Sequence, residues 1–228
     1  MSSFWIKENQ NYERSCMITC ALSGVVANRQ QCPAIPYTPE EYAAEAKRAY
    51  DAGAAVVHIH ARKPDGTPSY EVEDYRNIYE AVTAECPVII NFSTGAVGIP
   101  VEKKIASVKE IKPPIAALNM GSMNYAKYHP KKKTFVFDFV FANPFSEIIP
   151  LLTAMKEAGV KPEMECFDTG HVGNCYPLID MGLLEPPHQV SLIMGVLGGI
   201  PPTVENLAHQ VRMLPPQSDW EVIGISHD

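Results

Sequence analysis

The stretch that decides the fold is AAVVHIH at residues 54–60, an almost unbroken apolar run of strand length. The segment before it, TPEEYAAEAKRAYDAG at residues 38–53, predicts a helix that has Thr38 at its N-cap and Pro39 in its first turn and ends at Gly53. A strand that is apolar along its whole length is buried on both faces, as in a parallel sheet covered by helices. The two segments therefore indicate a helix that feeds a buried parallel strand.

The same pattern recurs along the chain. Further strands are expected at residues 16–22, 87–92, 115–119, 163–167, 188–194 and 220–225, and helices at 144–158, before Gly182 and from Thr203. Alternating β and α units of about 30 residues predict a parallel sheet, in either a closed barrel or a doubly wound fold. No G-x-G-x-x-G motif follows the first strand, which disfavours a dinucleotide-binding fold. We therefore expect an α/β protein of the TIM-type (β/α)8 barrel class.

The number of predicted strands indicates how much of the barrel the chain contains. Seven strands are predicted in 228 residues, whereas a (β/α)8 barrel usually needs about 250 residues and an eighth unit. We expect residues 1–228 to form a single barrel domain that is truncated after the seventh strand and lacks the eighth unit. Its first and seventh strands would then be open edges.

Composition excludes several classes of protein. The chain has 19 basic and 26 acidic residues and a net charge of −7, which argues against a nucleic-acid partner. Its one basic run, Lys131–Lys133, is expected to be a solvated loop. No apolar stretch approaches the roughly 20 residues that span a bilayer, and residues 1–14 do not resemble a signal peptide. A cytoplasmic protein with no membrane partner is the prediction.

His58 and His60 are the sharpest functional signal. Alternate residues of a strand point to the same face, so both imidazoles are expected to project together. They lie at the carboxyl end of the predicted second strand, where barrel enzymes place their active sites. Two converging imidazoles suit Zn²⁺ or another divalent metal. The alternative is a pair of hydrogen-bonded core histidines.

Polar residues also follow the next two strands. Ser93 and Gly95 lie in the loop STGAVG at residues 93–98, whose N–H groups could bind a carboxylate or oxyanion. An ordinary polar turn is the alternative. Asn119 holds the equivalent place at the end of the fourth strand, and these three residues are the candidate substrate-binding group.

Two further features come later in the chain. Glu165 is a carboxylate among apolar neighbours on the fifth strand, and burying such a group without a partner is costly, so a catalytic role is predicted. Glu163 shares its face, and either residue could instead belong to a structural ion pair. Gly198 and Gly199 follow the sixth strand and offer bare backbone that could approach a phosphate or pantetheine chain.

Several motifs together resemble those of the β-keto acid cleavage enzymes. They are TCALSG at 19–24, PAIPYTPEE at 33–41, AGAAVVHIHAR at 52–62, PDGTPS at 64–69, STG at 93–95, LNMGS at 118–122 and GVLGG at 195–199. The likeness extends over nearly all of residues 16–225. Singly most of these motifs are unspecific, but jointly they are specific.

The resemblance implies a metal-dependent acyltransferase that cleaves a C–C bond. In that family a β-keto acid and acetyl-CoA give acetoacetate and a new CoA thioester, in a homotetrameric (β/α)8 barrel that holds one Zn²⁺ or similar ion. The implied metal ligands are His58 and His60, the implied carboxylate contacts are Ser93 and Gly95, and Glu165 is the implied active-site carboxylate. Chemically, the metal would polarise the 3-keto oxygen and stabilise an enolate that attacks the thioester.

Three departures from the family pattern carry expectations of their own. The family's third metal ligand, with its catalytic aspartate and arginine, belongs to an eighth strand, so residues 1–228 alone are expected to be inactive. Ala117 lacks the hydroxyl that often precedes Leu118. Val26 stands where an aminohexanoate-cleaving member has an ammonium-binding glutamate, so a neutral or apolar β-keto acid is expected.

Two other functions stay open at this point. The chain could be a different metal-dependent barrel, such as a hydrolase or aldolase, which would ignore acetyl-CoA. It could also be an inactive truncated barrel that serves as a binding or interface module, in which case any bound metal would be substoichiometric and easily chelated.

Overall fold

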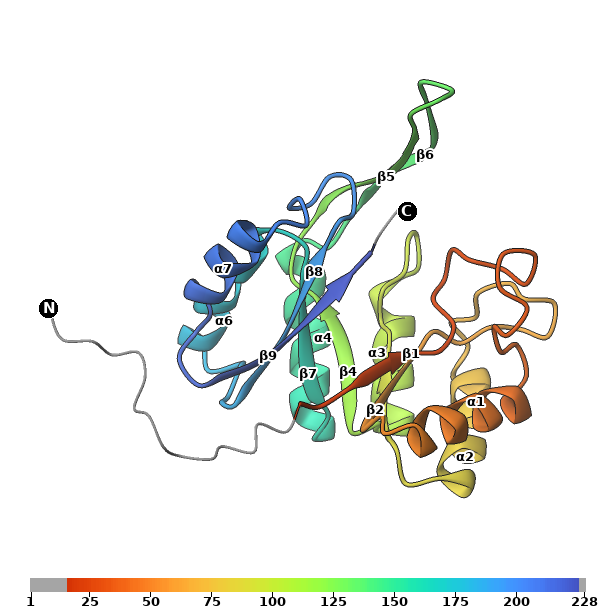
Figure 1. Cartoon of the computed structure of the whole chain (residues 1–228). Helices are drawn as coiled ribbons and strands as arrows, with labels where there is room; N and C mark the ends of the chain where they lie inside the picture. Colours follow the sequence, from red (N-terminus) through yellow and green to blue (C-terminus); the bar gives the residue numbers. More distant parts are fainter. Residues whose placement is uncertain (1–15, 226–228) are drawn as a thin grey trace, which may run out of the picture.

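Seven parallel strands form a single curled sheet in the computed structural model, which describes residues 16–225 (Figure 1). The strand order is β1-β2-β3-β4-β7-β8-β9, so the strands follow one another in the sheet as they do along the chain. The bounds are β1 Thr19–Ala21, β2 Val56–Ile59, β3 Ile89–Phe92, β4 Ile115–Asn119, β7 Lys161–Cys166, β8 His188–Met194 and β9 Ser218–Gly224. The sheet is a half-barrel whose edge strands are β1 and β9, as the predicted truncated barrel requires.

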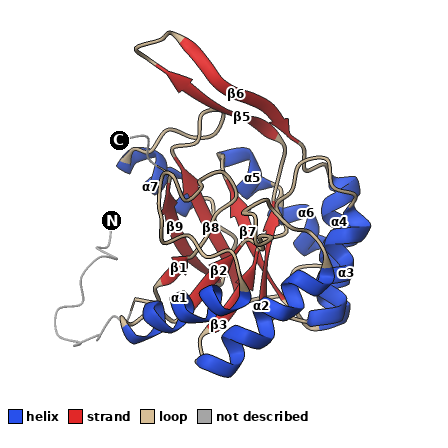
Figure 2. Ribbon diagram, turned by 90° about the vertical axis from the view of Figure 1, so that its right-hand side faces the viewer, coloured by secondary structure: helices blue, strands red, loops and turns tan. Residues whose placement is uncertain are grey.

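Helices lie around the outside of this sheet (Figure 2). They are α1 Pro39–Asp51, α2 Val72–Glu85, α3 Val101–Ile111, α4 Phe145–Ala158, α5 Thr169–Gly173, α6 Cys175–Asp180 and α7 Val204–Arg212. None of them is long and apolar enough to cross a membrane, within the part of the chain that the structure describes.

Two apolar clusters join the helices to the sheet. One packs α1 and α2 against β2 and β3 and contains Tyr42, Ile59 and Ile78. The other packs α3 and α4 against β4, β7 and β8 and contains Leu118, Leu152 and Met164. Because these clusters lie between the sheet and its helices, the inward face of the sheet is left for polar side chains.

The predicted elements are confirmed, with small differences at their ends. β4 and β8 have the predicted bounds, whereas the other strands differ by one to three residues at an end. Thr38 caps α1 as expected, since its hydroxyl accepts from the N–H of Glu41 and the Glu41 carboxylate accepts from the N–H of Thr38. Gly159 ends α4 in the left-handed conformation. The assignment of residues 1–228 to one domain stays a prediction.

A hairpin and three of the helices, α2, α3 and α5, were not anticipated at their positions. β5 (Met123–His129) and β6 (Thr134–Phe141) form an antiparallel hairpin between β4 and α4, separate from the main sheet. Its turn contains Lys131–Lys133, and these lysines are exposed, as expected for a solvated loop. The hairpin extends away from the half-barrel (Figures 1 and 2).

Candidate active site

The two predicted histidines lie together at the carboxyl end of β2. Nε2 of His58 is 3.3 Å from Nε2 of His60, so the convergence expected from their alternate positions is confirmed. The backbone of His60 is held in place by two hydroxyls. Ser23 donates to its carbonyl oxygen at 2.8 Å and accepts from its N–H at 3.1 Å, and Tyr42 donates to the same oxygen at 2.6 Å.

Burial keeps both imidazoles neutral at neutral pH. Desolvation lowers the pKa of His58 to about 4, and desolvation together with the neighbouring His58 and Arg62 lowers that of His60 to about 3. A neutral imidazole presents one nitrogen lone pair, which is the form that binds a metal. Both residues keep some solvent exposure, so a ligand could reach them.

A pair of carboxylates faces these histidines from β7. His58, Glu163 and Glu165 each place one ligand atom within 4.8 Å of the others. The Glu165 side chain is buried and forms no hydrogen bond with any of residues 16–225. Desolvation, with the nearby charge of Glu163, raises the pKa of Glu165 to about 8. An unpartnered carboxylate in this position is costly, and a cation would offset the cost.

Glu163 belongs to a chain of polar side chains across the interior of the sheet. The Ser191 hydroxyl lies 2.7 Å from a carboxylate oxygen of Glu163 and 2.7 Å from one of Glu221. Asn91 donates to Glu163, and Thr19 donates to Glu221 at 2.7 Å. Ser191 has a single hydrogen to donate, so it can donate to only one of the two carboxyl groups at a time, and a protonated Glu163 could donate to it in turn. Desolvation raises the pKa of Glu163 to about 7, in keeping with a shared proton.

The ion-pair alternative for these glutamates is wrong within residues 16–225. None of the salt bridges there includes Glu163 or Glu165, and the partners of Glu163 are neutral amides and a hydroxyl together with Glu221. Sequence reasoning missed Ser191 and Glu221. Each is a polar residue between two apolar ones on a predicted strand, and that isolated polar position was the available signal.

The candidate substrate-binding residues form a second group beside the first. The Ser93 hydroxyl accepts from the N–H of Gly95 at 3.2 Å, and a Cβ on Gly95 would lie 3.2 Å from Nδ2 of Asn119. The buried Oδ1 of Asn119 has no partner among the described residues. Asn119 pairs in register with Glu165 on the neighbouring strand, so their side chains share one face of the sheet. The structure thus brings the two groups to the same end of the half-barrel.

Arg62 was not singled out from the sequence, although it lies two residues beyond His60. Its buried guanidinium donates to four carbonyl oxygens in the loops after β1 and β2. They belong to Ser23, Gly24, Ala27 and Gly66. This arginine therefore clamps together two loops at the candidate site, and its burial could not be read from local sequence.

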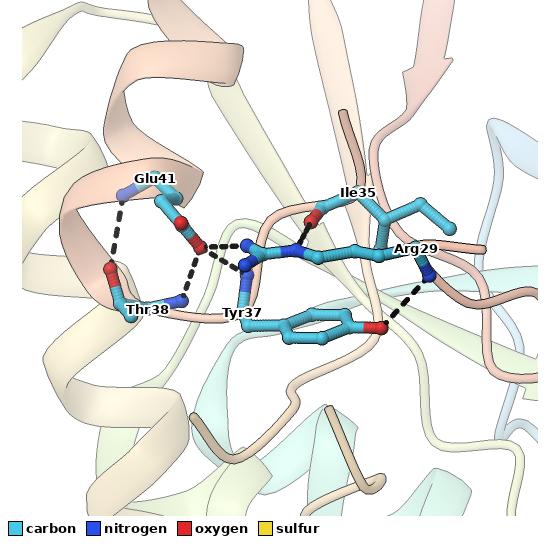
Figure 3. Close-up of polar contacts among 5 residues, drawn as sticks. All are labelled: Arg29, Ile35, Tyr37, Thr38 and Glu41. Atoms are coloured by element: carbon cyan, nitrogen blue, oxygen red, sulfur yellow. Dashed lines mark hydrogen bonds and ion pairs between the residues drawn. The ribbon is translucent and has the colours of Figure 1, made fainter. Parts of the chain in front are cut away.

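The loop after β1 is also tied to α1, as Figure 3 shows. The Arg29 guanidinium lies over the Tyr37 ring, 4.0 Å from its centroid, and donates to the Glu41 carboxylate and, at 3.0 Å, to the carbonyl oxygen of Ile35. Glu41 also accepts from the N–H groups of Tyr37 at 2.7 Å and Thr38 at 3.0 Å. These contacts fix the loop relative to the helix, and so they fix one border of the site.

Comparison with known proteins assigns the chain to a family. Residues 15–228 match the family described as beta-keto acid cleavage enzyme. The chain belongs to the β-keto acid cleavage enzyme family. The resemblance read from its motifs is thereby confirmed.

Named relatives in this family share about a third of the sequence. The chain is 34% identical to the "3,5-dioxohexanoate:acetyl-CoA acetone transferase" of Paraburkholderia graminis and 36% identical to the "3-keto-5-aminohexanoate cleavage enzyme" of Acetoanaerobium sticklandii. Each alignment covers 93% of this chain and 74% of the relative. The solved apo structure of ObcA superposes with a TM-score of 0.59 at 24% identity, over 72% of this chain and 37% of ObcA, and supports the fold alone.

Contacts within the protein itself explain why residues 198 and 199 are glycines. Gly198 has a φ of +110°, and a Cβ there would lie 1.9 Å from the carbonyl oxygen of Asn124. A Cβ on Gly199 would lie 2.5 Å from the carbonyl oxygen of Phe167. The protein's own backbone thus occupies the space beside both glycines. Their contact with a CoA ligand stays a prediction.

Proposed function

We propose that this protein condenses a β-keto acid with acetyl-CoA and releases acetoacetate and a new acyl-CoA. Membership of the β-keto acid cleavage enzyme family and the printed names of its relatives support this activity. The observation that carries it in the structure is the grouping of His58 with Glu163 and Glu165 at the end of the strands, next to His60. The bonds balance, since C2 of the keto acid leaves C3 and joins the acetyl carbon, while the CoA sulfur passes from that carbon to C3.

The residues at this place fit a divalent ion such as Zn²⁺. Two neutral imidazoles, His58 and His60, offer lone pairs, and the buried Glu165 carboxylate has no partner within residues 16–225. We propose the two histidines as the protein ligands. When bound there, an ion of this kind supplies positive charge that polarises the 3-keto oxygen.

The chain's own residues bind the substrate and move its proton. Glu165, with a pKa raised to about 8, is a suitable base for the proton on C2, because a carboxylate with a higher pKa is a stronger base. The Gly95 N–H orients the Ser93 oxygen, which leaves the Ser93 hydroxyl hydrogen free for the substrate carboxylate. Asn119 lies beside them with an unpaired amide oxygen. We propose these as the carboxylate-binding residues.

The distal end of the substrate is proposed to be neutral or apolar. Val26, in the loop after β1, is 60% exposed and has no charge to pair with an ammonium group. A buried cation without a partner is unstable, so an amino-substituted keto acid would bind worse than an alkyl one.

The deciding assay measures products with and without acetyl-CoA. With zinc and a neutral β-keto acid, we expect acetoacetate and the new CoA thioester in equal amounts, and only when acetyl-CoA is present. Loss of keto acid without acetyl-CoA would instead identify a hydrolase or aldolase.

Ion binding gives a readout that does not depend on turnover. In equilibrium dialysis, His58→Ala is expected to weaken zinc binding by more than about a hundredfold, since even outer-shell changes cost roughly 10–100-fold. The exposed His209 provides the matched control, and His209→Ala should leave affinity unchanged. Equal affinities in the two variants would rule out the proposed ligands. Zinc as the resident ion, a homotetramer and a cytoplasmic location complete the proposal.

A further inference from the structure

Lys104 is the only buried lysine among residues 16–225. Its side chain is 5% exposed, although it belongs to α3, on the outside of the half-barrel (Figure 2). In the described part of the chain the ammonium group has one charged partner, the Glu147 carboxylate on α4, at 3.4 Å. Burying an ammonium group is costly unless nearby negative charge compensates for it. One long contact offsets little of that cost.

Joining α3 to α4 does not require a buried lysine. Lys109, also on α3, contacts Glu157 on α4 at 2.8 Å, and both of these side chains stay about half exposed. Glu147 lies in the first turn of α4, where the helix dipole already stabilises a carboxylate. Because an exposed pair joins the same two helices, the burial of Lys104 indicates a further role.

The Lys104 side chain lines two small cavities behind the loop after β3. One of them is also lined by Ser93 and Thr94, and the other by Thr94 and Asn119. The loop is fixed on this side, since the Tyr75 hydroxyl donates to the carbonyl oxygen of Ser93 at 3.1 Å. Lys104 therefore lies on the helix side of the residues proposed to bind the substrate carboxylate.

The candidate site is rich in negative charge. Glu163, Glu165 and Glu221 lie close together inside the half-barrel, and a β-keto acid would add another carboxylate. Of the lysines and arginines within residues 16–225, only Arg62 and Lys104 are buried, and Arg62 already donates to four carbonyl oxygens in the loops after β1 and β2. Charges interact more strongly where water is excluded. Lys104 is the buried cation on the side of the proposed carboxylate-binding residues.

We propose that Lys104 determines the affinity of the site for a carboxylate, because its ammonium charge lies behind the loop that binds this group. The interaction acts through space, so Lys104 need not touch the ligand. Glu147 carries the opposite charge beside the same cavity and opposes this effect. The inference rests on the proposed function, because it concerns how the same site holds its substrate.

A ligand titration of the whole chain, followed by NMR, tests this role without turnover. Acetoacetate serves as the anionic ligand, and methyl acetoacetate is its uncharged counterpart. Lys104→Met should weaken the binding of acetoacetate by roughly fivefold, whereas Glu147→Gln should tighten it by about twofold. Neither change should alter the binding of methyl acetoacetate. Lys104→Arg keeps the charge and should bind acetoacetate like the wild type.

The matched control is Lys109→Met, which removes the other lysine that joins α3 to α4 and should leave both affinities unchanged. Circular dichroism checks that each variant is folded. Glu147 is 38% exposed, so Glu147→Gln should fold even if Lys104→Met does not. Weaker binding of acetoacetate by Glu147→Gln would by itself overturn the proposal.

A purely structural ion pair predicts a different result. Lys104→Met and Glu147→Gln would then change the binding of acetoacetate in the same direction. That outcome, or an unchanged affinity in Lys104→Met, would overturn the role of Lys104 and leave the proposed function intact. A wild type that binds neither ligand, or binds both equally well, would contradict the keto-acid site itself and the inference with it.

Discussion

The hydroxyl of Thr19 on β1 donates a 2.7 Å hydrogen bond to the carboxylate of Glu221 on β9. The two residues are 202 positions apart in the chain, and their strands are the opposite edges of the seven-stranded sheet. No backbone hydrogen bonds pair these strands in the described part of the structure. A side-chain contact thus connects the two edges of the half-barrel through its polar interior.

Replacing Thr19 with valine should therefore destabilise the sheet at its edges. Valine keeps the shape and the strand preference but removes the donor, which is expected to cost about 1–2 kcal/mol in the free energy of unfolding. Urea denaturation measures this change. Thr134→Val on the exposed β5–β6 hairpin removes a hydroxyl with only a weak 3.4 Å contact and should cost less than about 0.5 kcal/mol. Equal effects would show that the Thr19 contact contributes nothing.

Metal-free protein should lose stability as the pH rises from 6.5 to 8. The pKa values of Glu163 and Glu165 are raised from 4.5 to about 7 and about 8, so the folded state holds protons that the unfolded chain has released. The lowered pKa values of His58 and His60 act in the opposite direction, chiefly below pH 6.5, where they offset the contribution of the two glutamates. Between pH 6.5 and 8 the loss should be of the order of 2 kcal/mol.

Urea denaturation in the presence of a chelator at both pH values measures this loss. Glu165→Gln should flatten the dependence, because glutamine does not titrate. The exposed Glu157 serves as the comparison, and Glu157→Gln should leave the slope unchanged. A slope that persists in Glu165→Gln would assign the effect to other groups.

Arg62→Lys should loosen the loop after β1. An ammonium group cannot reach the carbonyl oxygens that the forked guanidinium holds at once, so unfolding should become easier by about 2–4 kcal/mol. Amide hydrogen exchange over residues 23–27 should speed up at the same time. Arg48→Lys, at a side chain that is 72% exposed, is the control and should change neither quantity. Unchanged exchange in Arg62→Lys would contradict the clamp.

Gly198→Ala should be one of the more damaging single changes in the protein. The new Cβ would meet the backbone oxygen of Asn124 at 1.9 Å, and a φ of +110° is strained for any side chain. We expect a loss of more than about 3 kcal/mol, read as a lower melting temperature. Gly173→Ala in α5 adds a Cβ with no atom within 4 Å and should change stability by less than about 1 kcal/mol. Similar melting temperatures would refute the close-packing explanation.

The strands of the half-barrel could be predicted because each carries its own local signal. A buried parallel strand is apolar along its length, as in residues 115–119, all of which are buried. The position of His58 and His60 followed from the same signal, since alternation on one strand decides which side chains converge. The cap at Thr38 is likewise local, because its partner Glu41 is three residues away.

Contacts across the fold could not be predicted in this way. Glu221 meets Thr19 only because the sheet curls, and Arg62 finds its carbonyl oxygens only where two loops meet. The β5–β6 hairpin was missed for a different reason. Its segment FVFDFVF at residues 135–141 has the residue types of a strand, but it is inserted between β4 and α4, inside one βα unit, and pairs outside the main sheet.

The aromatic contacts of the β5–β6 hairpin extend to the candidate site. Phe167, which contacts Tyr125 and Phe141, directly follows the last residue of β7 and is two positions from Glu165. A displacement of the hairpin would therefore act on the strand that carries Glu165, and by thermodynamic reciprocity a ligand that moves this end of β7 would shift the hairpin as well.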